Sequence, residues 1–185
     1  MFVTSCSPGP NNIVASYSGF NFGILKTIPH MLGVIFGFTS LVAIMNFGLV
    51  NVFQKYPMIQ EILKYTGSCF LIYLAYKISF SKSSSTDSKK NPVQFIETFF
   101  FQFINPKSVI VAVIMISTYV HRGQDFLFYS FWVIGVAFLF AIISINFWTL
   151  VGKFLRRFAT NEKFIKRFNY VMSFLLLTCI ATFYL

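Results

Sequence analysis

Long apolar runs alternate with short polar connections along the 185 residues of the chain. The hydrocarbon core of a bilayer is about 30 Å thick, so a helix that crosses it needs roughly 20 predominantly apolar residues. Each run is apolar continuously rather than at every second position, which favours helices over barrel strands. The runs are Met1–Phe20, Met31–Phe53, Met58–Phe80, Gln94–Tyr119, Phe126–Val151 and Phe168–Leu185. The pattern predicts an all-α integral membrane protein with six transmembrane helices.

Composition narrows the class further. The chain is 56% hydrophobic and only 11% charged, whereas soluble domains are about 25% charged. A chain of this length cannot bury so much apolar surface in one core. The net charge of +10 would suit a nucleic-acid partner, but the 15 Lys and Arg lie mostly between the apolar runs. These features exclude a soluble enzyme, a disordered chain and a nucleic-acid binder.

Polar residues divide the chain and indicate its orientation. The Ser- and Lys-rich segment Ser81–Pro92 is typical of a solvated linker. It separates repeat one (1–80) from repeat two (94–185), with a cytoplasmic linker over 81–93, inside a single transmembrane domain. With six spans, eleven of the 15 basic residues fall on one side, namely Lys26, Lys77, Lys82, Lys89, Lys90, Lys153, Arg156, Arg157, Lys163, Lys166 and Arg167, against Lys55, Lys64 and Arg122 on the other. Because basic connections stay in the cytoplasm, both termini are predicted to lie outside, and the basic residues are expected to contact lipid headgroups.

The two halves of the chain resemble each other in two places. Asn46 and Asn146 each precede Phe inside an apolar run and lie 100 residues apart. Pro8 and Pro106 interrupt the first run of each half and lie 98 residues apart. Because each half has an odd number of spans, the second half enters the membrane upside down. Two inverted three-helix repeats, each with a broken first helix, are the sequence sign of a secondary transporter.

The two breaks are where binding chemistry is expected. Proline breaks a helix interior because it lacks an N–H and clashes with the preceding turn, and the freed backbone groups then need buried or watery surroundings. A half-helix that begins at such a break offers N–H groups and a positive dipole end to an anion. Lys107 follows Pro106 near mid-membrane, where a cation costs about 2.5–3.5 kcal/mol. We therefore expect Lys107 and the half-helix ends to hold a substrate carboxylate.

Polar side chains around the breaks complete the expected substrate site. Its residues are Pro8, Gly9, Pro10, Asn11, Asn12, Asn46, Gln102, Asn105, Pro106, Lys107 and Asn146. Two alternatives stay open: Lys107 snorkels to the headgroups, and the Asn side chains only join helices. Glu97 is the carboxylate inside a predicted span, where it either carries a proton or pairs with the linker lysines.

Other residues indicate packing rather than binding. Gly33 and Gly37 have the GxxxG spacing that favours close helix packing. His30 and His121 lie at span ends, where they either cap the helix or titrate near neutral pH. Three cysteines lie far apart in apolar segments without CxxC or CxxH spacing, so we expect neither a disulfide, a metal site nor a cofactor. These cysteines are Cys6, Cys69 and Cys179.

The breaks also carry a resemblance to a known family. Ser-Pro-Gly-Pro-Asn-Asn at 7–12, together with Asn105-Pro106-Lys107, resembles the LysE/RhtB family of amino-acid exporters, and Leu63–Ile78 looks like the third helix of that family. The segments 94–107 and 167–185 look most like its cysteine/O-acetylserine exporter branch. The resemblance covers essentially the whole chain and implies a six-helix inner-membrane exporter driven by the proton gradient.

These observations predict a transporter rather than an enzyme. It would export a small amino acid or a derivative across the bacterial inner membrane by alternating access, with membrane lipids as partners, and a homo-oligomer is compatible with it. One rival is a small-ion or metal exporter, which would need a ring of Asp, Glu or His in the spans. The other is a membrane thiol-relay enzyme that uses the three cysteines, which requires two thiols close together.

Overall fold

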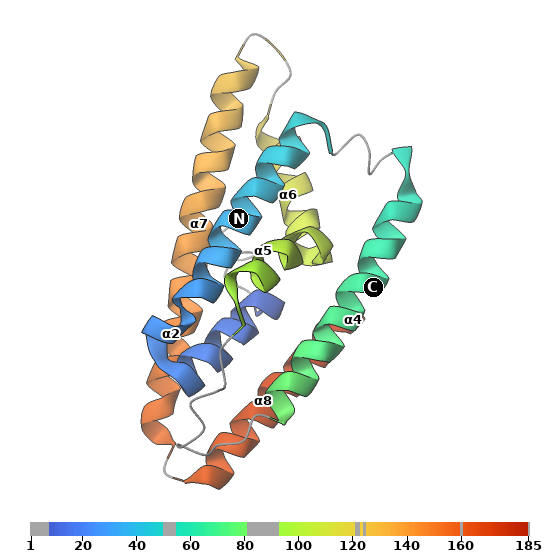
Figure 1. Cartoon of the computed structure of the whole chain (residues 1–185). Coiled ribbons are helices and arrows are strands. Elements are labelled where there is room, and N and C mark those ends of the chain that lie inside the picture. The colour runs from blue at the N-terminus through green and yellow to red at the C-terminus, as the bar shows by residue number, and fades with distance from the viewer. Residues whose placement is uncertain are drawn as a thin grey trace.

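The protein is all-helical in a computed structural model that describes residues 8–49, 55–80, 93–120, 123, 125–159 and 161–184. No strand occurs among these residues. In chain order the elements are α2 (Pro10–Ile44), the π-helical η1 (Met45–Leu49), α4 (Pro57–Ser79), α5 (Phe95–Ile104), α6 (Pro106–Tyr119), α7 (Phe126–Leu155), the 3-10 turn η2 (Arg156–Phe158) and α8 (Glu162–Ala181) (Figure 1). The predicted helical class is thus confirmed for the described part of the chain.

A glycine interrupts α2. Gly23 has φ 77° and ψ 176°, a conformation that is essentially restricted to glycine. The chain changes direction there: in Figure 1 the first half, residues 10–22, lies low in the molecule, and the second half rises alongside α7. The first half is about 20 Å long at 1.5 Å per residue, which is shorter than a bilayer core. Gly23 therefore separates two helical parts of α2, which correspond to the described parts of the runs predicted as Met1–Phe20 and Met31–Phe53. Near the expected break at Pro8–Pro10, α2 begins at Pro10.

A second break separates α5 from α6. The two helices are bent by 63° relative to each other. Asn105 lies between them with φ −86° and ψ 107°, because a residue before proline is pushed out of the helical region. Pro106 then begins α6 at a position where its missing N–H costs nothing. The break predicted inside Gln94–Tyr119 lies at this point.

Length and composition allow fewer membrane crossings than the sequence suggested. Three elements in the described residues are long and apolar enough, over Pro10–Gly48, Phe126–Phe158 and Glu162–Ala181, and the α5–α6 pair would be a fourth. Helix α4 has 23 residues but is less apolar, since it carries Glu61, Lys64 and Lys77. The structure thus supports three or four of the six predicted spans.

Glycines allow the first half of α2 to cross α7 closely. Gly19 lies against the backbone of Thr149, and Gly152 lies against the backbone of Ser16. A Cβ on either glycine would collide with a carbonyl oxygen of the other helix. The Ser16 hydroxyl also donates a hydrogen bond of 2.9 Å to the carbonyl of Trp148. The two helices are therefore fixed backbone to backbone.

The second half of α2 crosses α5 in the same manner. Gly33 contacts the side chain of Thr98, and a Cβ on Gly37 would lie 2.7 Å from the carbonyl oxygen of Phe99. The close packing predicted from the GxxxG spacing is thus confirmed. The third pair, α4 and α8, lies side by side (Figure 1) and is joined by a 2.9 Å hydrogen bond from Ser173 Oγ to the carbonyl of Ala75.

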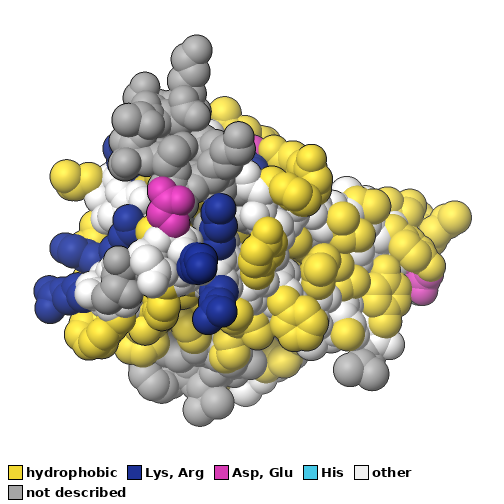
Figure 2. Space-filling view, turned by 90° about the horizontal axis from the view of Figure 1, so that it is seen from below, with side chains coloured by type: hydrophobic (Ala, Val, Ile, Leu, Met, Phe, Trp, Pro, Cys, Tyr) yellow, Lys and Arg dark blue, Asp and Glu magenta, His cyan; other side chains and the backbone are white. Residues whose placement is uncertain are grey.

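Basic side chains gather where α7 meets α8. The exposed cations there are Lys153, Arg156, Arg157, Lys163, Lys166 and Arg167. Figure 2, seen from below, shows Lys and Arg side chains gathered on part of this face beside apolar ones. Arg156 lies over the ring of Phe20 at 5.3 Å from its centroid. This end of the described structure is therefore strongly cationic.

Candidate functional site

Two helix N-termini meet inside the molecule. Helix α2 begins at Pro10 after the extended residue Gly9, and α6 begins at Pro106. Asn105 caps α6, since its side-chain oxygen accepts a hydrogen bond of 3.2 Å from the backbone N–H of Lys107. The first turn of a helix leaves N–H groups unpaired within the helix and carries partial positive charge. Two such ends thus point their positive poles into the same region.

The side chain of Lys107 joins the two breaks. A Cβ placed on Gly9 would lie 2.7 Å from Lys107 Nζ and 2.9 Å from its Cδ. The lysine therefore passes directly over the glycine that precedes α2, and a larger residue at that position would displace it. Lys107 is half-buried. The structure thus brings the start of α2 beside the start of α6, although Gly9 and Lys107 lie 98 residues apart in the sequence.

A cavity of about 80 Å³ lies beside this contact. Gly9 and Pro10 line it together with two groups of residues, which we call the polar wall and the apolar wall. The polar wall consists of Asn11, Asn12, Gln102, Asn105, Lys107, Ser108 and Ser144, and the apolar wall of Val34, Phe38, Val111, Phe140, Ala141 and Ile145. One water molecule needs at least about 10–15 Å³, so the cavity is large enough to hold a small polar group. Lys107 supplies the formal charge among these described lining residues.

Gln102 organises the polar wall. Its Oε1 accepts hydrogen bonds from Asn11 Nδ2 at 2.8 Å and from Ser108 Oγ at 3.0 Å. Its Nε2 donates to Asn11 Oδ1 at 3.1 Å and to the carbonyl of Thr98 at 2.8 Å. An amide side chain has two donors and two lone pairs, so every one is used. Gln102 therefore holds α2, α5 and α6 together around the cavity, and Asn11 faces it as a reciprocal partner.

The serines extend this network. Asn105 Nδ2 donates to Ser108 Oγ at 3.0 Å, and Ser144 Oγ on α7 donates to Asn12 Oδ1 at 3.3 Å. The network thus connects the first turn of α2 to α6 on one side and to α7 on the other. Neither Ser108 nor Ser144 is among the residues predicted from the sequence. The position of Ser108 directly after Asn105-Pro106-Lys107 was an available signal, whereas nothing in the sequence marked Ser144.

Four of the predicted site residues lie outside the cavity lining. Pro8 is exposed, and Pro106 is buried at the start of α6. Asn46 donates a hydrogen bond of 2.8 Å to Ser130 Oγ near the start of α7, and Asn146 donates one of 2.8 Å to the carbonyl of Ile142 in its own helix. Ser130 and Asn146 are separated by about 24 Å along α7 at 1.5 Å per residue. The repeated Asn-Phe pairs therefore do not share one site.

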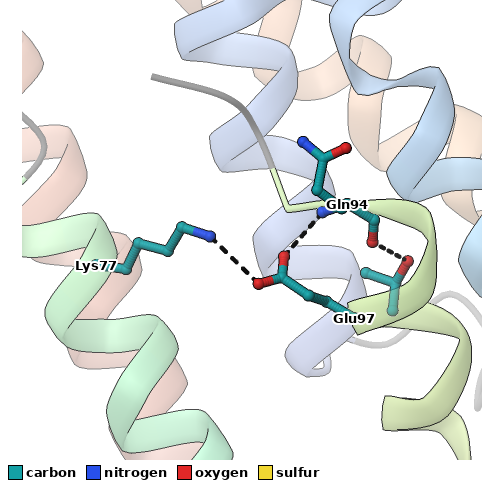
Figure 3. Close-up of polar contacts among 4 residues, drawn as sticks. Lys77, Gln94 and Glu97 are labelled. Atoms are coloured by element: carbon teal, nitrogen blue, oxygen red, sulfur yellow. Dashed lines mark hydrogen bonds and ion pairs between the residues drawn. The ribbon is translucent and has the colours of Figure 1, made fainter. Parts of the chain in front are cut away.

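Glu97 is held at the start of α5. Its carboxylate lies 3.5 Å from Lys77 Nζ on α4 and accepts a hydrogen bond of 2.9 Å from the backbone N–H of Gln94, as Figure 3 shows. The latter contact belongs to a capping box, which pairs orphan N–H groups of a helix start. Glu97 therefore forms an ion pair with Lys77 on α4, whereas the linker lysines expected as its partners lie outside the described residues.

The sequence alone does not show which apolar residues line the cavity. Val34 and Phe38 lie one helical turn apart on α2, and Phe140, Ala141, Ser144 and Ile145 share one face of α7. Helical periodicity groups such residues, but these runs are apolar around their whole circumference. Which face meets the cavity depends on how the helices cross.

The structure also shows where the residues lie that a metal exporter or a thiol-relay enzyme would use. Among the described residues there is no group of three or more His, Cys, Asp or Glu side chains that could hold a metal ion. Cys69 is exposed on α4, and Cys179 is buried on α8, both as free thiols. Cys6, the linker residues Ser81–Pro92, His121 and Arg122 lie outside the described residues.

Apolar helices around a polar cavity, with two helix N-termini beside it, are the arrangement expected of a membrane transporter. The comparison with known families agrees. Residues 2–184 match the family described as LysE type translocator, and the chain belongs to that family. The family resemblance noted in the sequence is thereby confirmed.

Curated relatives are named as efflux proteins. The cysteine/O-acetylserine efflux protein of Salmonella typhimurium is 28% identical over 181 residues, which cover 96% of this chain and 90% of the relative. The protein of the same name in Escherichia coli strain K12 is 28% identical over 184 residues, with the same coverage. No solved structure matches the chain significantly. The family and these relatives indicate a multi-pass membrane transporter, not an enzyme.

Proposed function

We propose that this protein exports a small amino acid or a close derivative across the bacterial inner membrane. Cysteine and O-acetylserine, the compounds in the names of its relatives, are the first candidates. The observation that carries the proposal is the contact of Lys107 with Gly9, directly before the start of α2, beside a polar cavity of about 80 Å³. This juxtaposition offers three sources of positive charge to one carboxylate.

The carboxylate binds between the two helix starts. Each N-terminus contributes about 0.3–1 kcal/mol to an adjacent anion, and up to about 2 kcal/mol when partly buried. A hydrogen bond from the Lys107 ammonium to a carboxylate contributes about 1.5–3 kcal/mol. Oxygen atoms of the Asn and Ser side chains on the polar wall receive the substrate's ammonium group. A charged molecule can therefore leave water at this point without losing all its electrostatic stabilisation.

The apolar wall receives the substrate's side chain. Phe38 and Phe140 lie on this wall with four aliphatic residues, and it contains no carboxylate among the described lining residues. A cationic side chain would meet the like charge of Lys107, which is unfavourable in a site of low dielectric constant. The site therefore suits a small uncharged side chain, such as a thiol or an acetyl ester.

Six spans in two inverted repeats would give this site access to either side in turn. In this arrangement the two halves of α2 are the first two spans, α4 is the third, the α5–α6 pair is the fourth, and α7 and α8 complete the second repeat (94–185). Three packing contacts support it. The first helix of repeat one crosses α7 where Gly19 meets Gly152, and α5 crosses the second half of α2 at Gly33 and Gly37. The two third helices, α4 and α8, pack together. Rocking of one repeat against the other then opens the cavity alternately.

The cationic end around η2 is proposed to face the cytoplasm. Six exposed Lys and Arg side chains lie there, beside the exposed aromatic residues Phe154 and Phe158. Basic connections are retained in the cytoplasm and bind anionic headgroups, at about 1 kcal/mol per residue near the surface. The termini would then lie outside, and lipids with anionic headgroups would be partners of this end.

Counterflow in liposomes tests the proposed function. Liposomes that contain the purified protein and unlabelled cysteine are expected to take up labelled cysteine transiently. Lys107→Ala should weaken the apparent affinity roughly 10- to 150-fold, and Lys107→Arg should retain part of it. Lys26→Ala, which removes an exposed cation outside the cavity, is the matched control. Normal affinity in Lys107→Ala would remove this lysine from the site, and absence of counterflow for all neutral amino acids would refute the function.

A further inference from the structure

His30 is a fully buried histidine in the second half of α2, with an exposed fraction of 0%. Its Nε2 lies 3.4 Å from the carbonyl oxygen of Asn11, in the first turn of the same bent element. Its own carbonyl oxygen accepts a hydrogen bond of 3.3 Å from Thr98 Oγ1 on α5. His30 therefore contacts both segments that carry the central amide pair of the cavity wall, Asn11 and Gln102.

The surroundings determine which ring nitrogen carries hydrogen. A carbonyl oxygen only accepts hydrogen bonds, so the nitrogen facing it must be the donor. Nε2 is thus protonated, and Nδ1 of the neutral ring presents a lone pair. Nδ1 is buried and has no hydrogen-bond partner among the residues that the structure describes. The ring therefore holds a basic nitrogen that is ready to accept a proton but is enclosed in this conformation.

Protonation of Nδ1 would demand a rearrangement. The new N–H would be a buried donor without an acceptor among the described residues, and leaving such a group unpaired is unfavourable, more so when it is charged. The ring would find partners by moving away from the first turn of α2. Because Asn11 forms both its contact with His30 and its reciprocal pair with Gln102, this movement would reach the cavity wall directly.

Charged groups on the neighbouring elements do not compensate a charge on the ring. They are Lys26 on α2, Glu97 on α5, Lys107 on α6, Lys153 on α7, and Glu162, Lys163, Lys166 and Arg167 on α8. Of the two carboxylates, Glu97 is engaged with Lys77 and with the backbone of Gln94, and Glu162 lies exposed in the first turn of α8. None of these groups, and none of the described Tyr or Cys side chains, hydrogen-bonds to Nδ1. A protonated His30 is therefore suited to another conformation than the one described.

We propose that Nδ1 of His30 binds the proton that drives export. Through Asn11, protonation of this ring changes the cavity wall. The inference rests on the proposed function and names the coupling residue for it. The proton enters from the outer side, binds the Nδ1 lone pair in the outward-open state and leaves to the cytoplasm after the transporter has turned. Histidine suits this exchange because its charge ordinarily changes between about pH 5 and 8.

Binding of substrate and binding of the proton then weaken each other, because both act on the Asn11–Gln102 pair. Bound substrate favours the intact Asn11–Gln102 wall, whereas a protonated ring favours its displacement. Such coupling is reciprocal: the factor by which the proton weakens cysteine binding equals the factor by which cysteine weakens proton binding, typically about 5- to 150-fold. This exclusion is what an exporter driven by an inward proton gradient requires.

Two liposome assays on the full chain separate this inference from the proposed function. Cysteine counterflow without a pH gradient tests export alone, and uphill movement of cysteine under an imposed pH gradient tests coupling. His30→Gln keeps an N–H donor for the Asn11 carbonyl but cannot be protonated. It is expected to retain counterflow, to lose uphill movement and to lose the pH dependence of cysteine affinity. Glu97→Gln, the control for the other candidate carrier, should retain all three.

The outcomes are distinguishable. Counterflow with uphill movement intact in His30→Gln would overturn the inference, as would loss of coupling in Glu97→Gln alone. Failure of the wild-type protein in counterflow would instead refute the proposed function.

If the His30→Gln variant does not fold, the inference can be tested by NMR on the His30 imidazole itself. The chain has two histidines, so His121→Gln leaves a single imidazole for ¹⁵N NMR. Cysteine should shift the titration of that ring to lower pH. A titration that is indifferent to cysteine would also overturn the inference.

Discussion

Replacing Gly9 by Ala should weaken substrate binding while leaving the fold intact. The added Cβ would lie 2.7 Å from Lys107 Nζ and 2.9 Å from its Cδ, about 0.5–0.7 Å closer than the 3.4 Å at which ordinary contact begins. Gly9 has φ −136° and ψ 173°, an extended conformation that alanine adopts freely. Because the atoms in the way belong to a flexible lysine side chain, the lysine moves rather than the backbone. The ammonium group is thus displaced by roughly the overlap.

The displacement should lower affinity measurably. Losing about 1–2 kcal/mol of the Lys107–carboxylate interaction corresponds to roughly 5- to 30-fold in the half-saturating concentration of cysteine. Counterflow at a series of cysteine concentrations measures this value, and thermal unfolding in detergent measures stability. The control is Gly135→Ala on α7, where an added Cβ meets nothing within 4 Å. Unchanged affinity in Gly9→Ala, or a fall in its unfolding temperature alone, would show that the lysine does not bind substrate across this glycine.

Three further substitutions test the packing and the network. Gly152→Ala places a Cβ against the backbone carbonyl of Ser16, which cannot move aside, and should lower stability by about 1–3 kcal/mol. An unchanged unfolding temperature would contradict the close crossing of α2 and α7. Gln102→Leu leaves buried polar groups unpaired and should cost at least about 2 kcal/mol and abolish counterflow, so a stable, active variant would rule out its central role. Asn146→Ala removes only a bond to its own helix and should transport normally, whereas a strong loss would place Asn146 in the site.

Several properties of this protein follow from its sequence by local rules. Apolar runs of bilayer length require helices, because only helices and closed barrels satisfy backbone groups in lipid. A proline pushes the residue before it out of the helical conformation, so one helix ends and the next begins at that point, as at Asn105 and Pro106. The family resemblance rests on the same local motifs, so the order of residues along the chain is enough to reveal it.

Local rules misplaced other features for an identifiable reason. The point at which the first two runs are divided also depended on one backbone conformation, since Gly23 separates the two helical parts of α2. The Asn-Phe repeat suggested a common site for Asn46 and Asn146, but register along the sequence does not place side chains on a common face. Asn46 contacts Ser130, and Asn146 contacts its own helix.

Tertiary structure alone decided what surrounds the breaks. The meeting of Gly9 with Lys107, the reciprocal pair of Asn11 and Gln102, and the enclosure of His30 are contacts between segments far apart in the chain. They depend on how closely the helices approach and at what angle, which is determined by glycines that contact another helix's backbone. The sequence shows which residues can interact with a charged group in a membrane, because the chemistry of each side chain and the free energy of burying it depend on that residue itself. Which of them act together is a property of the crossings, since an evenly apolar helix does not reveal which face its neighbours will cover.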